Sequence, residues 1–231
     1  MTKKRLSPKR TASFNQIGKV ANVESDISSM IGTIVLWLLW PSFNCALAEN
    51  GSYQLRAIIN TFLSLCASCG MCFATSKFLD EHSRFQMVHV QNATLAGGVA
   101  VGMSADLASP LGALCIGTAA GFLSTACFKY MTPFLDSRCG IPDTCGVGSL
   151  HGAPSLLALG ANMVITGTTN YHMRWGNDLQ PWYQLAGCAV TVGIAVTSGL
   201  ATGVIMALMG SPKRPYFDDE LWEVPSDFKK H

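Results

Sequence analysis

Apolar and small residues dominate six long stretches of this chain, and charged residues gather between them. Each stretch has roughly 20 residues, the length that an α-helix needs to cross the hydrocarbon core of a bilayer. The only Asp, Glu, Lys or Arg residues within the stretches are Lys77, Asp106 and Lys129, and each lies within three residues of an end. We therefore predict an all-α polytopic membrane protein with six transmembrane helices, at 27–48, 57–79, 88–107, 111–130, 150–168 and 182–209.

Composition supports this fold class. Charged residues make up 13% of the 231 residues, whereas about a quarter is usual in a soluble protein. Because the charge is missing from the predicted spans, a soluble bundle with unusually apolar core helices is the weaker alternative. The expected organisation is a disordered, basic cytoplasmic leader at 1–26, a transmembrane domain at 27–209 and a cytoplasmic tail at 210–231. No apolar run precedes Ile27, so we expect no cleavable signal peptide.

Basic residues between the spans predict the orientation. If both termini are cytoplasmic, fourteen of the sixteen Lys and Arg residues lie on the cytoplasmic side, and only Arg56 and Arg174 lie outside. This distribution agrees with the excess of positive charge in cytoplasmic loops. The same orientation places Asn50, in the run Asn50-Gly51-Ser52, in an external loop where an N-linked glycan could be attached.

Three of the nine cysteines, Cys66, Cys69 and Cys72, recur at a spacing of three within one predicted span. The spacing resembles a metal cluster, but no His or carboxylate accompanies it, so packing is the better interpretation. We expect no metal, no cofactor and no disulfide, and no nucleic-acid partner.

Glycines four residues apart predict close contacts between helices, because small residues let helix backbones approach in a bilayer. Such pairs occur in the last four predicted spans: Gly98 and Gly102, Gly117 and Gly121, Gly148 and Gly152, and Gly199 and Gly203.

Polar side chains within the spans are candidates for function, since ionisable groups are costly in a membrane. The amides and the first histidine are better explained as hydrogen bonds between helices: Asn60, His89, Gln91, Asn92 and Asn162. His151 differs because Asp143 precedes it by eight residues. In a continuous helix the two would lie about 12 Å apart along the axis, as expected for a carboxylate at a pathway mouth and an imidazole deeper inside. On spacing alone, a histidine that bonds a neighbouring helix explains the sequence equally well.

Several long runs resemble the Rh glycoproteins of the ammonium transporter superfamily. They are Met30-Ile31-Gly32-Thr33, Trp40-Pro41-Ser42-Phe43-Asn44, the segment 90–102 (VQNATLAGGVAVG), Tyr130-Met131-Thr132-Pro133-Phe134-Leu135, Asp143-Thr144-Cys145-Gly146 and Leu150-His151-Gly152. The resemblance extends over about residues 28–225, including Tyr216-Phe217-Asp218-Asp219-Glu220 in the tail.

The resemblance implies a trimeric plasma-membrane channel or transporter for ammonia or ammonium, with one pore per subunit. The family fold has two inverted five-helix halves and further helices, and the six predicted spans resemble the second inverted repeat plus the final helix. His151 matches a pore histidine, Asp143 a carboxylate at the inner vestibule, and Phe43 a phenylalanine of the gate. An imidazole can accept a proton from ammonium, and an aromatic ring can stabilise the cation.

Two hypotheses follow, because the first half of the family pattern, with its own pore histidine, is not matched. In the first, the chain is an N-terminally truncated member of the family and acts in ammonia transport through a histidine-lined pore. In the second, it is a non-conducting membrane subunit that associates with full-length partners. We therefore expect a homotrimer or a hetero-oligomer in the bilayer. Neither hypothesis is an enzyme, since no nucleophile or metal set accompanies His151.

Overall fold

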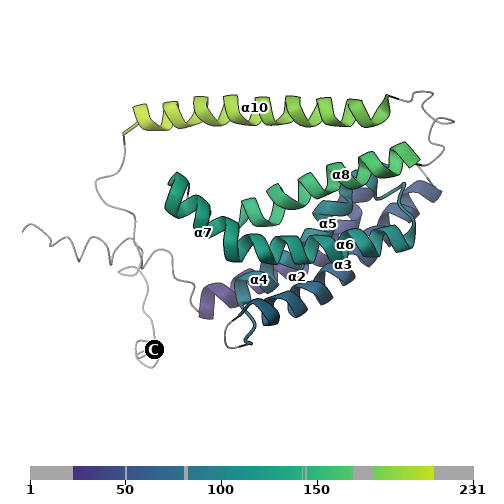
Figure 1. The fold of residues 1–231 in the computed structure, drawn as a ribbon, viewed down its shortest axis with the longest axis horizontal. Helices are drawn as coiled ribbons and strands as arrows, with labels where there is room; N and C mark the ends of the chain where they lie inside the picture. The colour runs from purple at the N-terminus through teal and green to yellow at the C-terminus, as the bar shows by residue number, and fades with distance from the viewer. Residues whose placement is uncertain are drawn as a thin grey trace, which may run out of the picture. The chain divides into compact units, whose positions relative to one another are not determined.

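A computed structural model describes residues 23–49, 51–80, 83–141, 143, 145–168 and 179–210. Regular structure in these ranges is entirely helical (Figure 1). The α-helices are α2 (Val23–Cys45), α3 (Ser52–Leu79), α4 (Met87–Ala93), α5 (Ala96–Val101), α6 (Pro110–Ala126), α7 (Thr132–Phe134), α8 (Ala153–Thr168) and α10 (Gln180–Leu208). A 3₁₀ turn, η1 (Gly102–Ser104), and three π-helical segments, η2 (Cys127–Met131), η3 (Leu135–Cys139) and η4 (Gly148–Gly152), complete the set.

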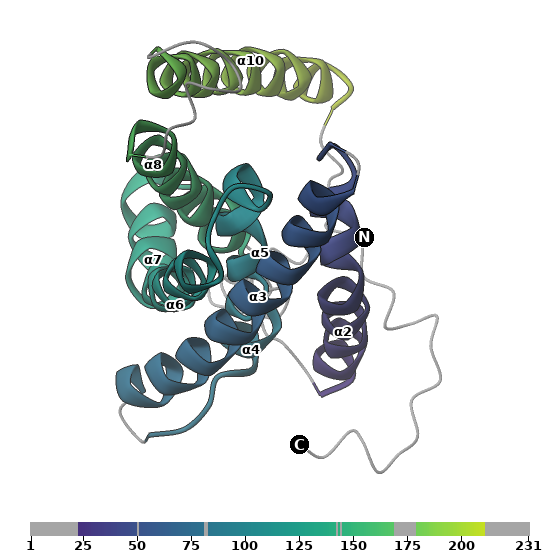
Figure 2. The ribbon, with the colours of Figure 1, turned by 90° about the vertical axis from the view of Figure 1, so that its right-hand side faces the viewer.

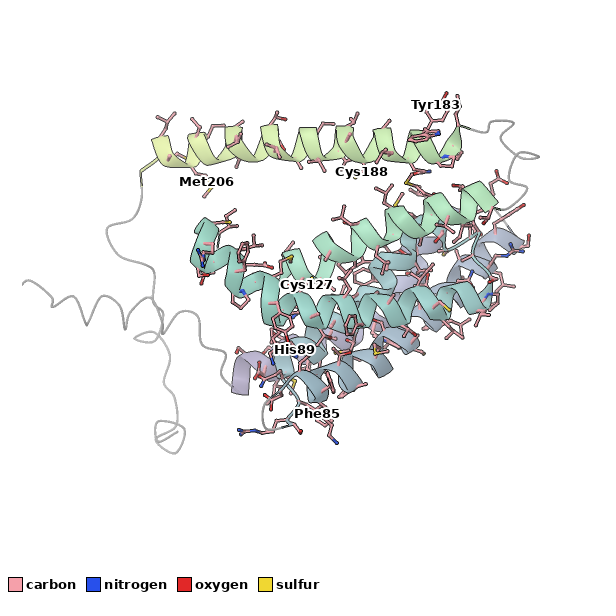
Figure 3. All side chains as sticks on the ribbon, in the orientation of Figure 1. Phe85, His89, Cys127, Tyr183, Cys188 and Met206 are labelled. Carbon is pink, nitrogen blue, oxygen red and sulfur yellow. The ribbon has the colours of Figure 1, made fainter. Side chains whose placement is uncertain are left out.

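Two compact units divide the chain, residues 1–185 and 186–231. The first contains the bundle from α2 to α8, and most of α10 belongs to the second. Side chains such as Tyr183, Cys188 and Met206 project from α10 along its whole length (Figure 3). The helix contains no Asp, Glu, Lys or Arg, as expected of a membrane span.

Four helices in the described residues are long and apolar enough to cross a membrane: Ser25–Cys45, Ser52–Leu79, Pro110–Cys139 and Gln180–Leu208. They correspond to four of the six expected spans. The first helix begins at Val23, before the expected start at 27, and the third continues through η2, α7 and η3 to Cys139. The helical segment therefore continues past 130, where we expect the fourth span to end. Of the other two expected spans, 150–168 lies in an unbroken helical segment formed by η4 and α8, whereas 88–107 does not form one continuous helix.

The expected span at 88–107 is interrupted at Thr94 and Leu95, where α4 ends and α5 begins. A hydroxyl from α3 accounts for this break. In a continuous helix the Gly97 amide would bond the Ala93 carbonyl. Instead, the Ser68 hydroxyl donates to the Ala93 carbonyl at 2.7 Å and accepts from the Gly97 amide at 3.1 Å. Insertion of a side chain into the helical hydrogen-bond ladder is a recognised cause of a break.

The Ser68 hydroxyl belongs to a row of polar residues on one face of α3, which we call the α3 polar row: Asn60, Ser64, Ser68, Cys72 and Ser76. Their spacing of four residues places them on one side of the helix. The Asn60 amide donates to the carbonyls of Ala105 and Ala108, both at 2.8 Å, and the Ser64 hydroxyl donates to the Gly97 carbonyl at 2.8 Å. Irregular backbone at membrane depth is tolerated only where such groups are satisfied within the protein.

The C-terminal part of the α3 polar row contacts α4. The Cys72 thiol lies 3.3 Å from the His89 carbonyl, and the Ser76 hydroxyl lies 2.9 Å from Nδ1 of the His89 ring. Elsewhere, the Asn162 amide of α8 donates to the Met103 carbonyl at 2.6 Å, and the Gln91 amide donates to the Asp26 carbonyl at 2.9 Å. These contacts support the interpretation of Asn60, His89, Gln91 and Asn162 as links between helices. The Asn92 amide, in contrast, donates to the Val88 carbonyl of its own helix at 3.0 Å.

Close packing of α6 on α3 explains one of the predicted glycine pairs (Figure 2). A Cβ atom on Gly117 would lie 2.1 Å from the Ser64 carbonyl oxygen, and one on Gly121 would lie 2.5 Å from the Ser68 carbonyl oxygen. Both contacts are with backbone, so only glycine allows this approach. The prediction is therefore confirmed for this pair. Gly199 and Gly203, in contrast, have no atom within 4 Å of a built Cβ.

Candidate functional site

Trp40, on α2, connects two of the residues that the sequence singled out. Its indole stacks on the His151 imidazole with ring centroids 6.1 Å apart and an interplanar angle of 22°. The Phe43 ring lies edge-on to the same indole, with centroids 6.4 Å apart. Positions 40 and 43 share a helix face because residues three apart are neighbours on a helix. Phe43, Trp40 and His151 thus form a continuous row of rings, which we call the aromatic row.

A glycine on α5 leaves room for the Trp40 indole. A Cβ on Gly98 of α5 would lie 2.7 Å from Cδ1 and Nε1 of the indole. The ring therefore fits only because α5 has no side chain at this position. The indole Nε1 is buried and has no hydrogen-bond partner in the described part of the chain. Beside it, the Asn44 amide donates to the Gly98 carbonyl at 3.0 Å and ties α2 to α5.

His151 is presented by the π-helical turn η4, just after a tight turn at Gly146. Gly146 has φ +73°, which strains any residue with a side chain, and a Cβ there would lie 2.3 Å from Cζ of Phe128. π-Helical turns are rare and are often found at functional sites. The local backbone therefore brings His151 against Trp40 by a combination of one positive-φ glycine and one wide helical turn.

Asp143 lies in the segment just before η4, and not in a continuous helix with His151. Its Oδ2 accepts a hydrogen bond of 2.9 Å from the Gly148 amide, at the start of η4. A carboxylate here satisfies an otherwise unpaired amide and complements the positive end of the helix. The helical segment begins only at 147, so the separation of about 12 Å expected for a continuous helix does not apply. Asp143 is thus connected to His151 through the first residues of η4.

The aromatic row is open on one side in the described structure. Phe43 is 75% exposed, and the His151 side chain is also exposed. Trp40 is half-buried between them. An aromatic face can attract a small cation, and a neutral imidazole can accept or share a proton. The row therefore combines two aromatic ring faces with one group that can accept a proton.

The remaining candidates do not join this site. His89 is buried beside Ser76 and the Phe128 ring. The described residues contain no group of three or more His, Cys, Asp or Glu side chains suited to a metal ion. All nine cysteines are free thiols. The glycosylation candidate Asn50 lies outside the described residues.

The contact of Trp40 with His151 is not predicted by the sequence. Trp40 lies in the same run as Phe43, but only Phe43 matches a ring of the family's gate. The available signal was the spacing of three between these two aromatic residues on one predicted helix.

These features define a polytopic helical membrane protein with an aromatic row that ends in a histidine, and comparisons with known proteins identify its family. The model of the Ammonium Transporter Family matches residues 5–215. "Ammonium transporter Rh type C" of Sus scrofa is 40% identical over 227 residues, covering 89% of this chain and 49% of the relative. "Ammonium transporter Rh type A" of Mus musculus is 42% identical over 207 residues, covering 87% of this chain and 46% of the relative.

A solved structure of Nitrosomonas europaea Rh50, described as a member of the Rhesus protein family of channels, has the same fold. The TM-score is 0.77 with 31% sequence identity, and the match covers 91% of this chain and 52% of the other. The chain belongs to the Ammonium Transporter Family and is an integral membrane protein. It spans about half the length of the curated relatives it matches. Membership of a transporter family confirms the expectation that the chain is not an enzyme.

Proposed function

We propose that this chain forms one wall of a pathway for ammonia or ammonium, with His151 as the residue that accepts or shares the proton. The stacking of His151 on Trp40 is the observation that supports this most directly, because it places a proton acceptor at the end of an aromatic row. The family supplies the substrate class, since its members are named as ammonium transporters.

Chemistry explains why such a row suits this substrate. Ammonium is a small, strongly hydrated cation, and moving it unpaired into an apolar environment is costly. Phe43 and Trp40 can compensate part of the lost hydration through their ring faces. The imidazole of His151 then accepts a proton, after which a neutral molecule meets a much smaller barrier. Asp143 contributes by holding the turn that carries His151.

The open side of the aromatic row requires a second wall, and we infer that an oligomer supplies it. A pore in a bilayer must be closed by protein on all sides, whereas Phe43 and His151 are exposed in the isolated chain. A homotrimer, or an assembly with longer family members, would provide the missing contacts. A non-conducting subunit that depends on such partners is the alternative function.

Ammonium-driven pH change in liposomes tests the proposal. The purified 231-residue chain should alkalinise or acidify the lumen faster than empty vesicles, and His151→Ala should remove this increment. Ser155→Ala is a matched control, because Ser155 is exposed one turn further along and its hydroxyl bonds only the local Gly152 carbonyl at 2.8 Å. Its flux should equal that of the native chain.

Two results would argue against the proposal. Equal flux through the native chain and His151→Ala would remove the histidine from the pathway. No flux above empty vesicles, together with co-purification of the chain with a full-length relative, would assign the chain to the subunit alternative.

A further inference from the structure

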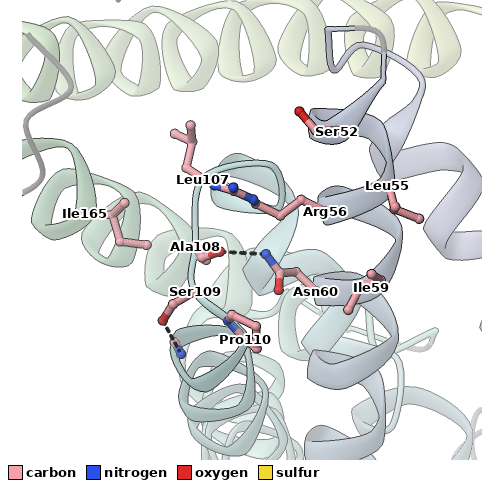
Figure 4. Close-up of a pocket in the computed structure, with 11 residues that line it drawn as sticks. Ser52, Leu55, Arg56, Ile59, Asn60, Leu107, Ala108, Ser109, Pro110 and Ile165 are labelled. Carbon is pink, nitrogen blue, oxygen red and sulfur yellow. Dashed lines mark hydrogen bonds between the residues drawn. The ribbon is translucent and has the colours of Figure 1, made fainter. Parts of the chain in front are cut away.

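A second site lies away from the aromatic row, in a cavity of about 650 Å³ at the first turns of α3 and α6 (Figure 4). Segments distant in sequence form it: the start of α3, the connection 107–109 and Ile165 near the end of α8. The sequence predicted all of these positions at one face of the membrane. With this predicted topology, the cavity lies at the level where lipid headgroups meet acyl chains.

The walls of the cavity are mostly apolar, and their one charged group is Arg56. Leu55, Ile59 and Leu107 contribute aliphatic surface, while Arg56 extends across the space between α3 and the 107–109 connection (Figure 4). No carboxylate lines the cavity beside Arg56. An arginine near the end of an apolar helix directs its guanidinium to the interface, where phosphate is the matching anion.

Asn60, one helical turn from Arg56, provides an independent indication of a ligand. Its side chain is 0% exposed and lines the cavity. Both hydrogens of its amide nitrogen are used, toward the carbonyls of Ala105 and Ala108. Its Oδ1 has no partner in the described structure and points away from Ala108 (Figure 4). A buried acceptor without a donor is unfavourable, so this end of the cavity lacks an N–H or O–H group.

We propose that this cavity binds a glycerophospholipid whose headgroup carries both a phosphate and a hydrogen-bond donor. Arg56 holds the phosphate, the Asn60 Oδ1 accepts from the headgroup amine or hydroxyl, and the aliphatic walls contact the upper acyl chains. Phosphatidylglycerol and phosphatidylethanolamine meet both requirements. Phosphatidylcholine has the phosphate but no donor, and inorganic phosphate has no acyl chain.

Native mass spectrometry of the purified chain, with each lipid added at equal concentration, tests the assignment. Phosphatidylglycerol and phosphatidylethanolamine should be retained in preference to phosphatidylcholine. Arg56→Gln should weaken their binding about tenfold or more, because a charge-assisted hydrogen bond is lost. Arg56→Lys should keep most of the binding. Arg84→Gln, which removes an exposed arginine beyond the other end of α3, should bind like the native chain.

Several outcomes would overturn the proposal. Equal binding by Arg56→Gln and Arg84→Gln, at equal helix content by circular dichroism, would show only general contact with headgroups. Equal retention of phosphatidylcholine would remove the role of Asn60. Displacement of lipid by millimolar inorganic phosphate would make the site one for the free anion. A dimer that Arg56→Gln abolishes would assign the cavity to a second copy of the chain.

Discussion

Replacement of Ser68 by alanine should destabilise the bundle more than its small change in volume suggests. The Ser68 hydroxyl bonds both the Ala93 carbonyl and the Gly97 amide, at 2.7 and 3.1 Å. Both backbone groups are buried, and the break between α4 and α5 keeps them from bonding each other. Alanine at 68 leaves one donor and one acceptor unpaired.

The size of the effect follows from these two groups. A buried polar group that loses its partner costs about 1–3 kcal/mol in a water-soluble protein. In membranes, side-chain hydrogen bonds average about 0.6 kcal/mol, because the unfolded state also finds partners. Two groups therefore give a free-energy loss of about 2 kcal/mol, between these limits, or a roughly 30-fold change in the unfolding equilibrium.

Unfolding in mixed micelles, with increasing SDS and tryptophan fluorescence as the signal, measures this loss. Trp37 and Trp40 pack against the core and report on its integrity. Ser42→Ala is the matched control, because its hydroxyl makes one exposed bond of 2.6 Å to the Leu39 carbonyl. We expect a change of less than about 0.5 kcal/mol for the control. Equal stability of the two variants would refute the explanation of the helix break.

Two further predictions concern other contacts in the first unit. Gly117→Ala should lower the free energy of unfolding by about 1–3 kcal/mol, because its Cβ would lie 2.1 Å from the Ser64 carbonyl oxygen. Gly160→Ala, with nothing within 4 Å of its Cβ, is the control, and an equal loss there in the SDS titration would contradict steric contact as the cause. Asp143→Ala should cost about 1 kcal/mol through the lost bond to Gly148, whereas Asp143→Asn should retain most of it. An equal loss in the two Asp143 variants would indicate that charge, and not capping, is responsible.

Much of the fold could be predicted because length and polarity alone identify long membrane helices. The stretches at 27–48, 57–79, 111–130 and 182–209 correspond to helices that meet those criteria. Length and polarity cannot reveal a break in a helix when side chains of neighbouring helices bond the backbone groups at the break. The segment 88–107 has the composition of a span, but the Ser68 hydroxyl interrupts its hydrogen bonds.

The site illustrates a similar limit. The resemblance singled out Phe43 and His151, and the structure joins them through Trp40. Trp40 and His151 lie more than one hundred residues apart in the sequence. A contact between such distant residues cannot be predicted from a local pattern. The polar residues of α3 are a different case: their spacing of four is visible in the sequence, and it could have been recognised as one face.

The α3 polar row also bears on how well the bundle insulates protons. Ser64 and Ser68 are four residues apart, about 6 Å along the axis, which exceeds the reach of a direct hydrogen bond. Each hydroxyl donates to a backbone carbonyl, Gly97 or Ala93, and a carbonyl has no proton to pass on. Between Ser64 and Ser68 the row is thus divided into separate hydroxyl–carbonyl pairs. This part of the row gives the protein internal polarity without a relay along which protons could pass.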